Sequence, residues 1–189
     1  MSQKMNNNND QDIQRDVYVM RNKNLVKVLN NQQLTSKSIS FKNMHQELIK
    51  KEELLQIINI RTIFLVEVSI LKPHEATIPE KVMELLLAIL KCGKWINPII
   101  VHNKTFTIMD GHHRYKVALL LGLKFIPCYL LNYKNDVKVF SRRADYQITP
   151  NSIIQHSVSK KVYPYKTTRH VFCHKNRLSK LNLSIEKLS

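Results

Sequence analysis

The pattern of apolar and polar positions divides the chain near residue 61. From residue 1 to about 40, Asn, Gln, Ser and Lys dominate, and large apolar residues gather only at Val17–Met20 and Leu25–Leu29. This composition predicts a poorly ordered or lightly attached leader. Met44 to Ile60 places Leu and Ile at helical spacing between charged residues, which predicts an amphipathic helix.

Residues 61–133 show the alternation of short apolar runs and turn residues that is typical of a compact domain. The first predicted elements are a strand over Ile63–Leu71 and a helix over Pro79–Leu90 that Gly93 ends. A hairpin follows, with strands over Pro98–Val101 and Phe106–Met109 and a turn at Asn103-Lys104. The last are a helix over Tyr115–Leu121, which Gly122 caps, and a strand over Phe125–Leu131. Pro73 is expected to break the first strand. This order predicts a small α/β or α+β layer fold.

The character of the chain changes again after Tyr133. We expect a strand at Val137–Phe140, a short helix at Pro150–Val158 and a loop over Val162–His170. The predicted organisation is therefore a polar leader (1–60), a central domain (61–133) and a C-terminal extension (134–189).

Composition narrows the class of protein. Hydrophobic residues make up 43% of the 189 residues, enough for one domain with a sizeable core. No apolar run approaches the roughly 20 residues of a membrane helix, and Met1–Asp16 lacks the apolar segment of a signal peptide, so we place the protein in the cytoplasm. Cys92, Cys128 and Cys173 are far apart, which favours neither a disulfide framework nor a zinc knuckle.

The net charge of +16 is uneven. Residues 1–60 carry 9 basic and 6 acidic side chains, whereas residues 134–189 carry 12 and 3, more than half of the excess. A basic surface attracts phosphates of nucleic acids or nucleotides. Lys- and Asn-rich chains also arise from skewed base composition, and the two interpretations weigh about equally for the bulk charge.

The run Asp110-Gly111-His112-His113-Arg114 lies between a predicted strand and a predicted helix. Free N–H groups and the helix dipole favour an anion at such a turn, Gly111 allows close backbone approach, and Arg114 offers a planar fork for phosphate oxygens. Asp110 could hold a metal ion or take a proton. Because adjacent histidines point in different directions, phosphate donation by His112 or His113 is favoured over a zinc site.

Two further segments carry polar side chains that fit such a site. Lys166-Thr167-Thr168-Arg169-His170 could wrap an anion with several donors, although composition alone favours an exposed basic loop. Glu75 follows the first predicted strand and could face Asp110, because both follow strands of one sheet; its alternative is a solvated loop acid. Trp95 is expected to fill the core or a pocket rim, and it is counted with the substrate-binding residues.

Three separated motifs resemble the free serine kinase branch of the ParB/sulfiredoxin-like nucleotide-binding superfamily. They are Leu71-Lys72-Pro73-His74-Glu75, Asp110 to Arg114, and Pro164-Tyr165 followed by Lys166 to His170. The resemblance covers about residues 62–174 and departs at Tyr165, where the family usually has proline. His112 occupies the position of the reactive cysteine of sulfiredoxins, which excludes their chemistry. ParB partition proteins usually have Glu-Arg in place of the two histidines.

The resemblance implies roles for these residues. Glu75 would be the catalytic carboxylate, and Asp110 a second acid or base that also helps to place Mg²⁺. The nucleotide phosphates would be held by Gly111, His112, His113, Arg114, Lys166, Thr167 and Thr168. The serine substrate would be held by Glu75, Trp95, Arg169 and His170.

The function that the resemblance implies is transfer of a phosphoryl group from ATP or ADP to free L-serine, with Mg²⁺ neutralising the phosphates. The alternative is a non-enzymatic ParB-like regulator that binds a nucleotide and grips DNA with its basic tail. A third possibility is a kinase for another small hydroxyl compound. The donor, the acceptor and the oligomeric state are left open by the sequence; nucleic acid is a possible but less favoured partner, and no membrane partner is expected.

Overall fold

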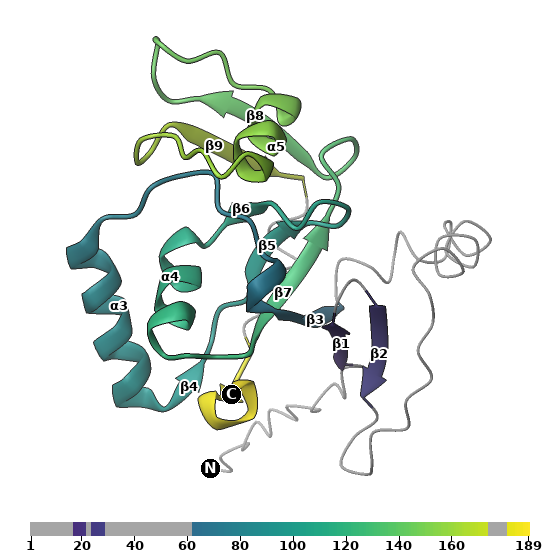
Figure 1. The fold of residues 1–189 in the computed structure, drawn as a ribbon, viewed down its shortest axis with the longest axis vertical. Coiled ribbons are helices and arrows are strands. Elements are labelled where there is room, and N and C mark those ends of the chain that lie inside the picture. Colours follow the sequence, from purple (N-terminus) through teal and green to yellow (C-terminus); the bar gives the residue numbers. More distant parts are fainter. Residues whose placement is uncertain (1–16, 22–23, 29–61, 174–180) are drawn as a thin grey trace, which may run out of the picture.

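The computed structural model describes residues 17–21, 24–28, 62–173 and 181–189. Its centre is a mixed six-stranded sheet in the order β2-β1-β3-β7-β5-β6 (Figure 1). The strands are β1 (Val17–Arg21), β2 (Asn24–Val28), β3 (Ile63–Glu67), β5 (Ile99–His102), β6 (Ile108–Asp110) and β7 (Phe125–Leu131). The short 3₁₀ helix η1 (Val68–Ile70) follows β3.

The strand directions bring the two candidate carboxylates to one edge of the sheet. β3 is antiparallel to β7, β7 is parallel to β5, and β5 is antiparallel to β6, so β3 and β6 run the same way. Beyond β3 the Lys72 N–H donates to the Phe106 carbonyl at 2.9 Å, and the Ile108 N–H donates to the Lys72 carbonyl at 3.0 Å. The segment before Glu75 therefore lies along the start of β6, which ends at Asp110.

Two helices, α3 (Pro79–Cys92) and α4 (His112–Leu120), contact each other beside the sheet (Figure 1). α3 starts at a proline, whose missing N–H costs nothing in the first turn, and ends at Gly93 with φ 63°. Their buried residues join the strands in one core, which includes Val82, Ile89, Val117, Ala118, Ile99, Val101 and Ile126.

A second, smaller unit lies above the β6 end of the sheet in Figure 1. It contains the antiparallel pair β8 (Val137–Ser141) and β9 (Thr168–Phe172) and the helix α5 (Pro150–Val158). A reciprocal capping box between Thr149 and Ser152 starts α5. Ile153 on α5, fully buried, packs in a core of its own with Tyr163 and Ile100.

The chain then returns to the first unit. β10 (Leu183–Ser184) pairs with β4 (Lys94–Trp95), and the 3₁₀ helix η3 (Ile185–Leu188) buries Leu188. Across the described segments, no helix combines the length and the apolar character that crossing a membrane requires.

The structure confirms the predicted fold class and most elements. The two hairpin strands begin and end one or two residues later than predicted, and β4, β10 and η3 were not predicted. The larger differences are at four places. The first strand ends at Glu67 rather than Leu71, and the second helix starts at His112 rather than Tyr115. The expected loop over Val162–His170 contains the first residues of β9. The expected poorly ordered leader contributes β1 and β2, and the helix predicted over Met44–Ile60 lies outside the described residues.

Candidate functional site

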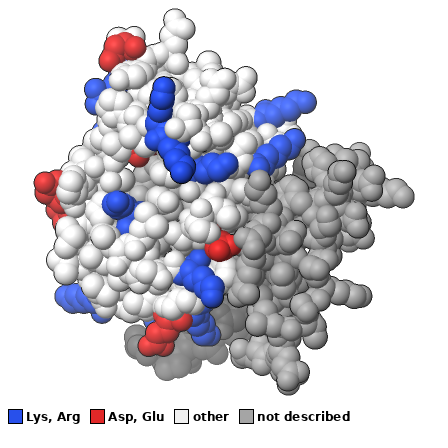
Figure 2. All heavy atoms as spheres, in the orientation of Figure 1, with Lys and Arg blue, Asp and Glu red and all other residues white. Residues whose placement is uncertain are grey.

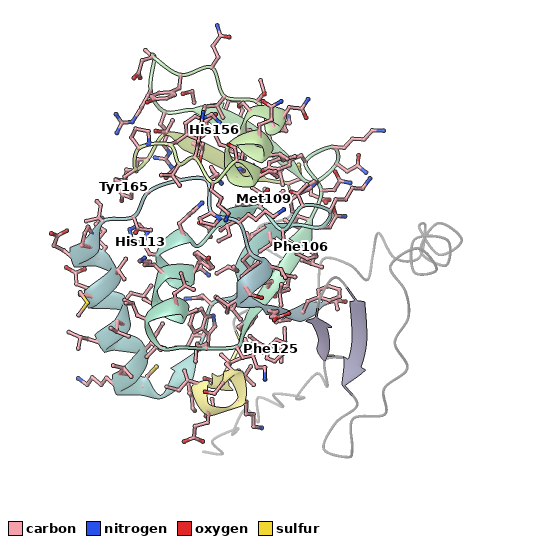
Figure 3. All side chains as sticks on the ribbon, in the orientation of Figure 1. Phe106, Met109, His113, Phe125, His156 and Tyr165 are labelled. Carbon is pink, nitrogen blue, oxygen red and sulfur yellow. The ribbon has the colours of Figure 1, made fainter. Side chains whose placement is uncertain are left out.

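A cavity of about 710 Å³ lies between the two units. Three segments that are distant in sequence line it: the loop after β3, the turn from β6 into α4, and the chain around the start of β9. Figure 3 shows His113 of α4 close to Tyr165 of the third segment, and their ring centroids are 5.6 Å apart. The sheet edge, the helix start and the C-terminal extension therefore share one site.

Three hydrogen bonds hold the Glu75 side chain in this cavity. Its Oε1 accepts the Lys166 N–H at 2.9 Å, and its Oε2 accepts both the Thr168 N–H at 2.9 Å and the Thr168 hydroxyl at 2.7 Å. Around it, the Tyr163 N–H donates to the His74 carbonyl at 2.8 Å and the Ala76 N–H donates to the Tyr163 carbonyl at 2.9 Å. Glu75 is thus held by the distal segment and is not a freely solvated loop acid.

Gly111 starts α4 with φ 105°, a conformation that L residues rarely adopt. A Cβ atom there would lie 2.5 Å from Cγ2 of Ile99 and 3.2 Å from Cζ of Arg114. Glycine therefore lets the turn pass against β5, and it sets the direction in which the first turn of α4 faces the cavity.

The two histidines of that turn accept hydrogen bonds from different backbone groups. Nε2 of His112 accepts the His74 N–H at 3.3 Å, and Nε2 of His113 accepts the Ile78 N–H at 3.2 Å. Since each Nε2 is an acceptor, each neutral ring carries its proton on Nδ1. Burial lowers the pKa of His112 to about 3, helped by His170, and burial together with Lys81 lowers the pKa of His113. Both rings are thus neutral donors near pH 7, and they point to separate partners as expected.

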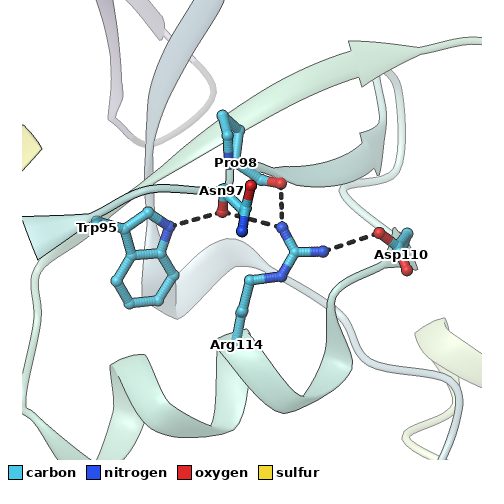
Figure 4. A network of polar contacts seen from close by, with 5 residues as sticks. All are labelled: Trp95, Asn97, Pro98, Asp110 and Arg114. Atoms are coloured by element: carbon cyan, nitrogen blue, oxygen red, sulfur yellow. Dashed lines mark hydrogen bonds and ion pairs between the residues drawn. The ribbon is translucent and has the colours of Figure 1, made fainter. Parts of the chain in front are cut away.

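Arg114 is engaged within the protein. Its Nη1 donates to the Asn97 carbonyl at 2.9 Å and also to the Pro98 carbonyl, and its Nη2 pairs with Asp110 Oδ2 at 2.8 Å (Figure 4). Trp95 Nε1 donates to the same Asn97 carbonyl at 3.0 Å. The guanidinium has five donors, so it keeps some for a ligand, but much of its fork fixes the Asp110 turn against the start of β5.

The segment from Lys166 to His170 divides between the cavity and the interior. Lys166 has φ 56° and lies with Nζ 5.4 Å from the centroid of the Tyr165 ring. Arg169 is exposed and lines the cavity. His170 also lines the cavity, and its Nε2 lies 3.1 Å from the Tyr133 hydroxyl. Burial lowers the pKa of His170 to about 4.

The structure places three predicted site residues differently. Thr167 is fully buried, donates its hydroxyl to the Pro164 carbonyl at 2.7 Å and is not part of the cavity lining. The Thr168 hydroxyl is used by Glu75, so it is not a free phosphate donor. Trp95 is 1% exposed and fills the core, as expected, but it lines a smaller pocket and not the large cavity assigned to the substrate. Motif spacing alone did not show which side chains at the start of β9 point into the interior.

Sequence reasoning missed Arg142 and Tyr165, which both line the cavity. Arg142 follows β8, and its N–H donates to the Thr167 carbonyl at 2.8 Å. Nothing near Arg142 in the sequence marks it, because the pairing of β8 with β9 brings it there. Tyr165 stands at the departure from the family motif, and that departure was the available signal.

The cavity is electropositive. Arg114, Arg142, Lys166 and Arg169 line it together with the acids Glu75 and Asp110. Figure 2 shows Lys and Arg side chains gathered across the upper half of the visible face, at the level of β9 and α5. A phosphate group is the kind of ligand that such a lining attracts.

The lining also bears on a metal ion. Among the described residues no group of three or more His, Cys, Asp or Glu side chains could hold one. Mg²⁺ usually binds through one or two carboxylates plus substrate phosphates. Asp110 fits that role, because its side chain is 56% exposed and Arg114 pairs with Oδ2 alone.

Comparison with known proteins gives the family. The sequence profile of the ParB N-terminal domain matches residues 43–141, about half of the chain. A ParB-like protein of Sulfolobus acidocaldarius is 40% identical over 85 residues, which are 45% of this chain and 42% of that protein.

Relatives that are named as kinases include the following two. An ATP-dependent L-serine kinase of Staphylothermus marinus is 33% identical over 73 residues (36% of this chain, 29% of that protein). An ADP-dependent L-serine kinase of Thermococcus kodakarensis is 25% identical over 95 residues (48% and 39%). In these three relatives the matched segment spans less than half of the protein.

A solved structure of a free serine kinase in complex with AMP has the same fold. It superimposes with a TM-score of 0.61 at 15% identity, over 67% of this chain and 93% of that one. The similarity extends beyond the matched half of the sequence and confirms the predicted ParB/sulfiredoxin-like fold.

Proposed function

The chain belongs to the family of ParB N-terminal domains, and within it we propose a nucleotide-dependent kinase that phosphorylates the hydroxyl group of free L-serine. One observation carries the proposal. The carboxylate of Glu75 is fixed by three hydrogen bonds in an electropositive cavity that also holds the Asp110–Arg114 turn. The named activities of the two kinase relatives support the same reaction.

In the proposed reaction, Glu75 acts as the general base. A carboxylate offers about four lone-pair positions, and three donors already use three of them, which leaves one on Oε1 for a substrate hydroxyl. The serine Oγ forms a bond to the terminal phosphorus of the nucleotide as the bond to the leaving phosphate oxygen breaks. The serine proton passes to Glu75.

The other polar residues of the cavity would bind the negatively charged groups of the nucleotide and of serine. The Nδ1–H groups of His112 and His113 and the N–H groups of the first turn of α4 are donors for nucleotide phosphates. Lys166 and Arg169 contribute positive charge on the opposite wall, where Arg169 can pair with the carboxylate of serine. Mg²⁺, held by Asp110 and the phosphates, would offset the charge that develops during transfer.

The test is Glu75→Gln, which keeps the shape of the side chain and removes its basicity. We expect phosphoserine formation to fall by at least about 100-fold, the lower end of the range for a general base. Nucleotide affinity measured by calorimetry should change little. Glu84→Gln on the exposed face of α3 is the matched control and should keep full activity. Full activity of Glu75→Gln would exclude Glu75 as the base.

A second function is favoured by the charge of +16 and by the ParB-like relative. It is a nucleotide-binding regulator that associates with DNA. It requires duplex binding at physiological salt, with an affinity that falls steeply as salt rises, together with no turnover of serine. Serine phosphorylation without such binding would decide for the kinase.

A further inference from the structure

His74 is a buried polar residue with no assigned role in the reaction. It is 0% exposed and immediately precedes Glu75. Its ring lies against two other imidazoles, with centroid distances of 4.5 Å to His112 and 5.6 Å to His170. Its Nε2 lies 3.1 Å from the Thr168 hydroxyl, the group that contacts Glu75.

The donor and acceptor of each hydrogen bond from His74 through Thr168 to Glu75 follow from the chemistry of the three side chains. An ionised carboxylate only accepts, so the Thr168 hydroxyl gives its one proton to Glu75 Oε2. The Thr168 oxygen can then only accept from His74, and Nε2 of His74 must carry the proton. Among the described residues, Nδ1 of His74 forms no hydrogen bond of good geometry, and a contact of the ring with the Ile108 backbone only partly offsets the effect of burial, which lowers the pKa of His74.

We propose that His74 is a positioning residue: through Thr168 it fixes the orientation of the Glu75 carboxylate for proton transfer. The relay runs from His74 Nε2–H to the Thr168 hydroxyl and on to Glu75 Oε2. The proposal rests on the kinase function proposed above. It assigns Thr168 to the orientation of the base and not to phosphate binding.

The same residue connects the base with the nucleotide side of the cavity. The His74 backbone N–H donates to Nε2 of His112, which leaves the Nδ1–H of His112 for a phosphate. The ring of His74 therefore orients Glu75 while its backbone orients His112. The orientations of the Glu75 carboxylate and of the His112 ring thus both depend on His74, which is fully buried.

The kinetic test removes the hydroxyl of the relay. Thr168→Val keeps the volume and should lower kcat roughly 10- to 100-fold, while KM for the nucleotide stays within about twofold, because a small misplacement of a reacting group costs rate more than binding. Thr168→Ser should recover most of that loss. His74→Leu should also lower kcat and His74→Gln should recover part of it, because the amide nitrogen can donate from a position near that of Nε2.

Thr107→Val is the control for losing a buried threonine hydroxyl. Thr107 is 0% exposed, contacts the Ser157 hydroxyl at 2.6 Å and lies outside the cavity lining. It should lower stability without lowering kcat. Equal losses of kcat in Thr107→Val and Thr168→Val would overturn the relay, as would full turnover by Thr168→Val.

A measurement without turnover separates this proposal from the kinase function. Nitrogen-15 NMR of the full chain at pH 7 should show His74 neutral with its proton on Nε2. A proton on Nδ1 would overturn the relay even if the protein is an active kinase. A wild-type protein that makes no phosphoserine but shows the Nε2–H form would overturn the kinase function and keep the hydrogen-bond chain.

Discussion

At the scale of single residues, Gly111 has the most stringent requirement. Its φ of 105° and its closeness to Ile99 are two separate reasons for glycine, one conformational and one steric. Gly122, at the end of α4, has φ 63° but nothing within 4 Å of a built Cβ. A comparison of alanine substitutions at Gly111 and Gly122 therefore separates the cost of backbone strain from the cost of steric overlap.

Replacing Gly111 with alanine should lower the free energy of unfolding by about 3 kcal/mol, the sum of strain and overlap. Gly122→Ala should cost about 1 kcal/mol, since only the strain applies. Urea unfolding of the two variants measures the difference. Equal losses would show that the contact with Ile99 relaxes without cost.

At the scale of elements, the sequence predicted what depends on local signals. Helix α5 and strand β7 have the predicted bounds, and α3 starts at the predicted Pro79, because proline, glycine and apolar spacing act within a few residues. The start of α4 was placed three residues late. The glycine was recognised as permissive, but that it starts the helix follows from its packing on β5.

Elements that depend on distant pairing were not predictable in this way. Thr168 to Phe172 is a strand because it pairs with β8, and a basic segment of mixed polarity carries no such signal. The same pairing decides which residues face the cavity. Glu75 and Asp110 were expected at one site because both follow strands of one sheet, and they line the same cavity. The burial of Thr167 and the presence of Arg142 at the cavity required the three-dimensional structure.

At the scale of the whole molecule, the two units meet over a layer of histidines. Burial lowers the pKa of His74, of His112 to about 3 and of His170 to about 4, all from an ordinary value of 6.5. These rings are neutral in the folded protein and become cationic on unfolding below about pH 6.5. Their effect on stability therefore has a definite sign.

The free energy of unfolding should be highest above pH 6.5 and should fall as the pH drops toward 4, because these histidines bind protons in the unfolded chain but stay neutral in the folded protein. Each such histidine adds a slope of about 1.4 kcal/mol per pH unit within that window. Urea unfolding at pH 7.5, 6.0 and 5.0 measures it, and His74→Gln should reduce the slope. A free energy of unfolding that is level from pH 7.5 to 5.0 would contradict the neutral histidine layer.

The proposed kinase activity is transfer of a phosphoryl group from a nucleotide to free L-serine. Phosphorus NMR of the purified protein with Mg²⁺ and L-serine, run once with ATP and once with ADP, tests it most directly. A phosphoserine resonance is expected with at least one donor, and the sample that shows it identifies the productive donor. The absence of phosphoserine with both donors, in samples where nucleotide binding is clear, would rule out the proposed serine kinase activity.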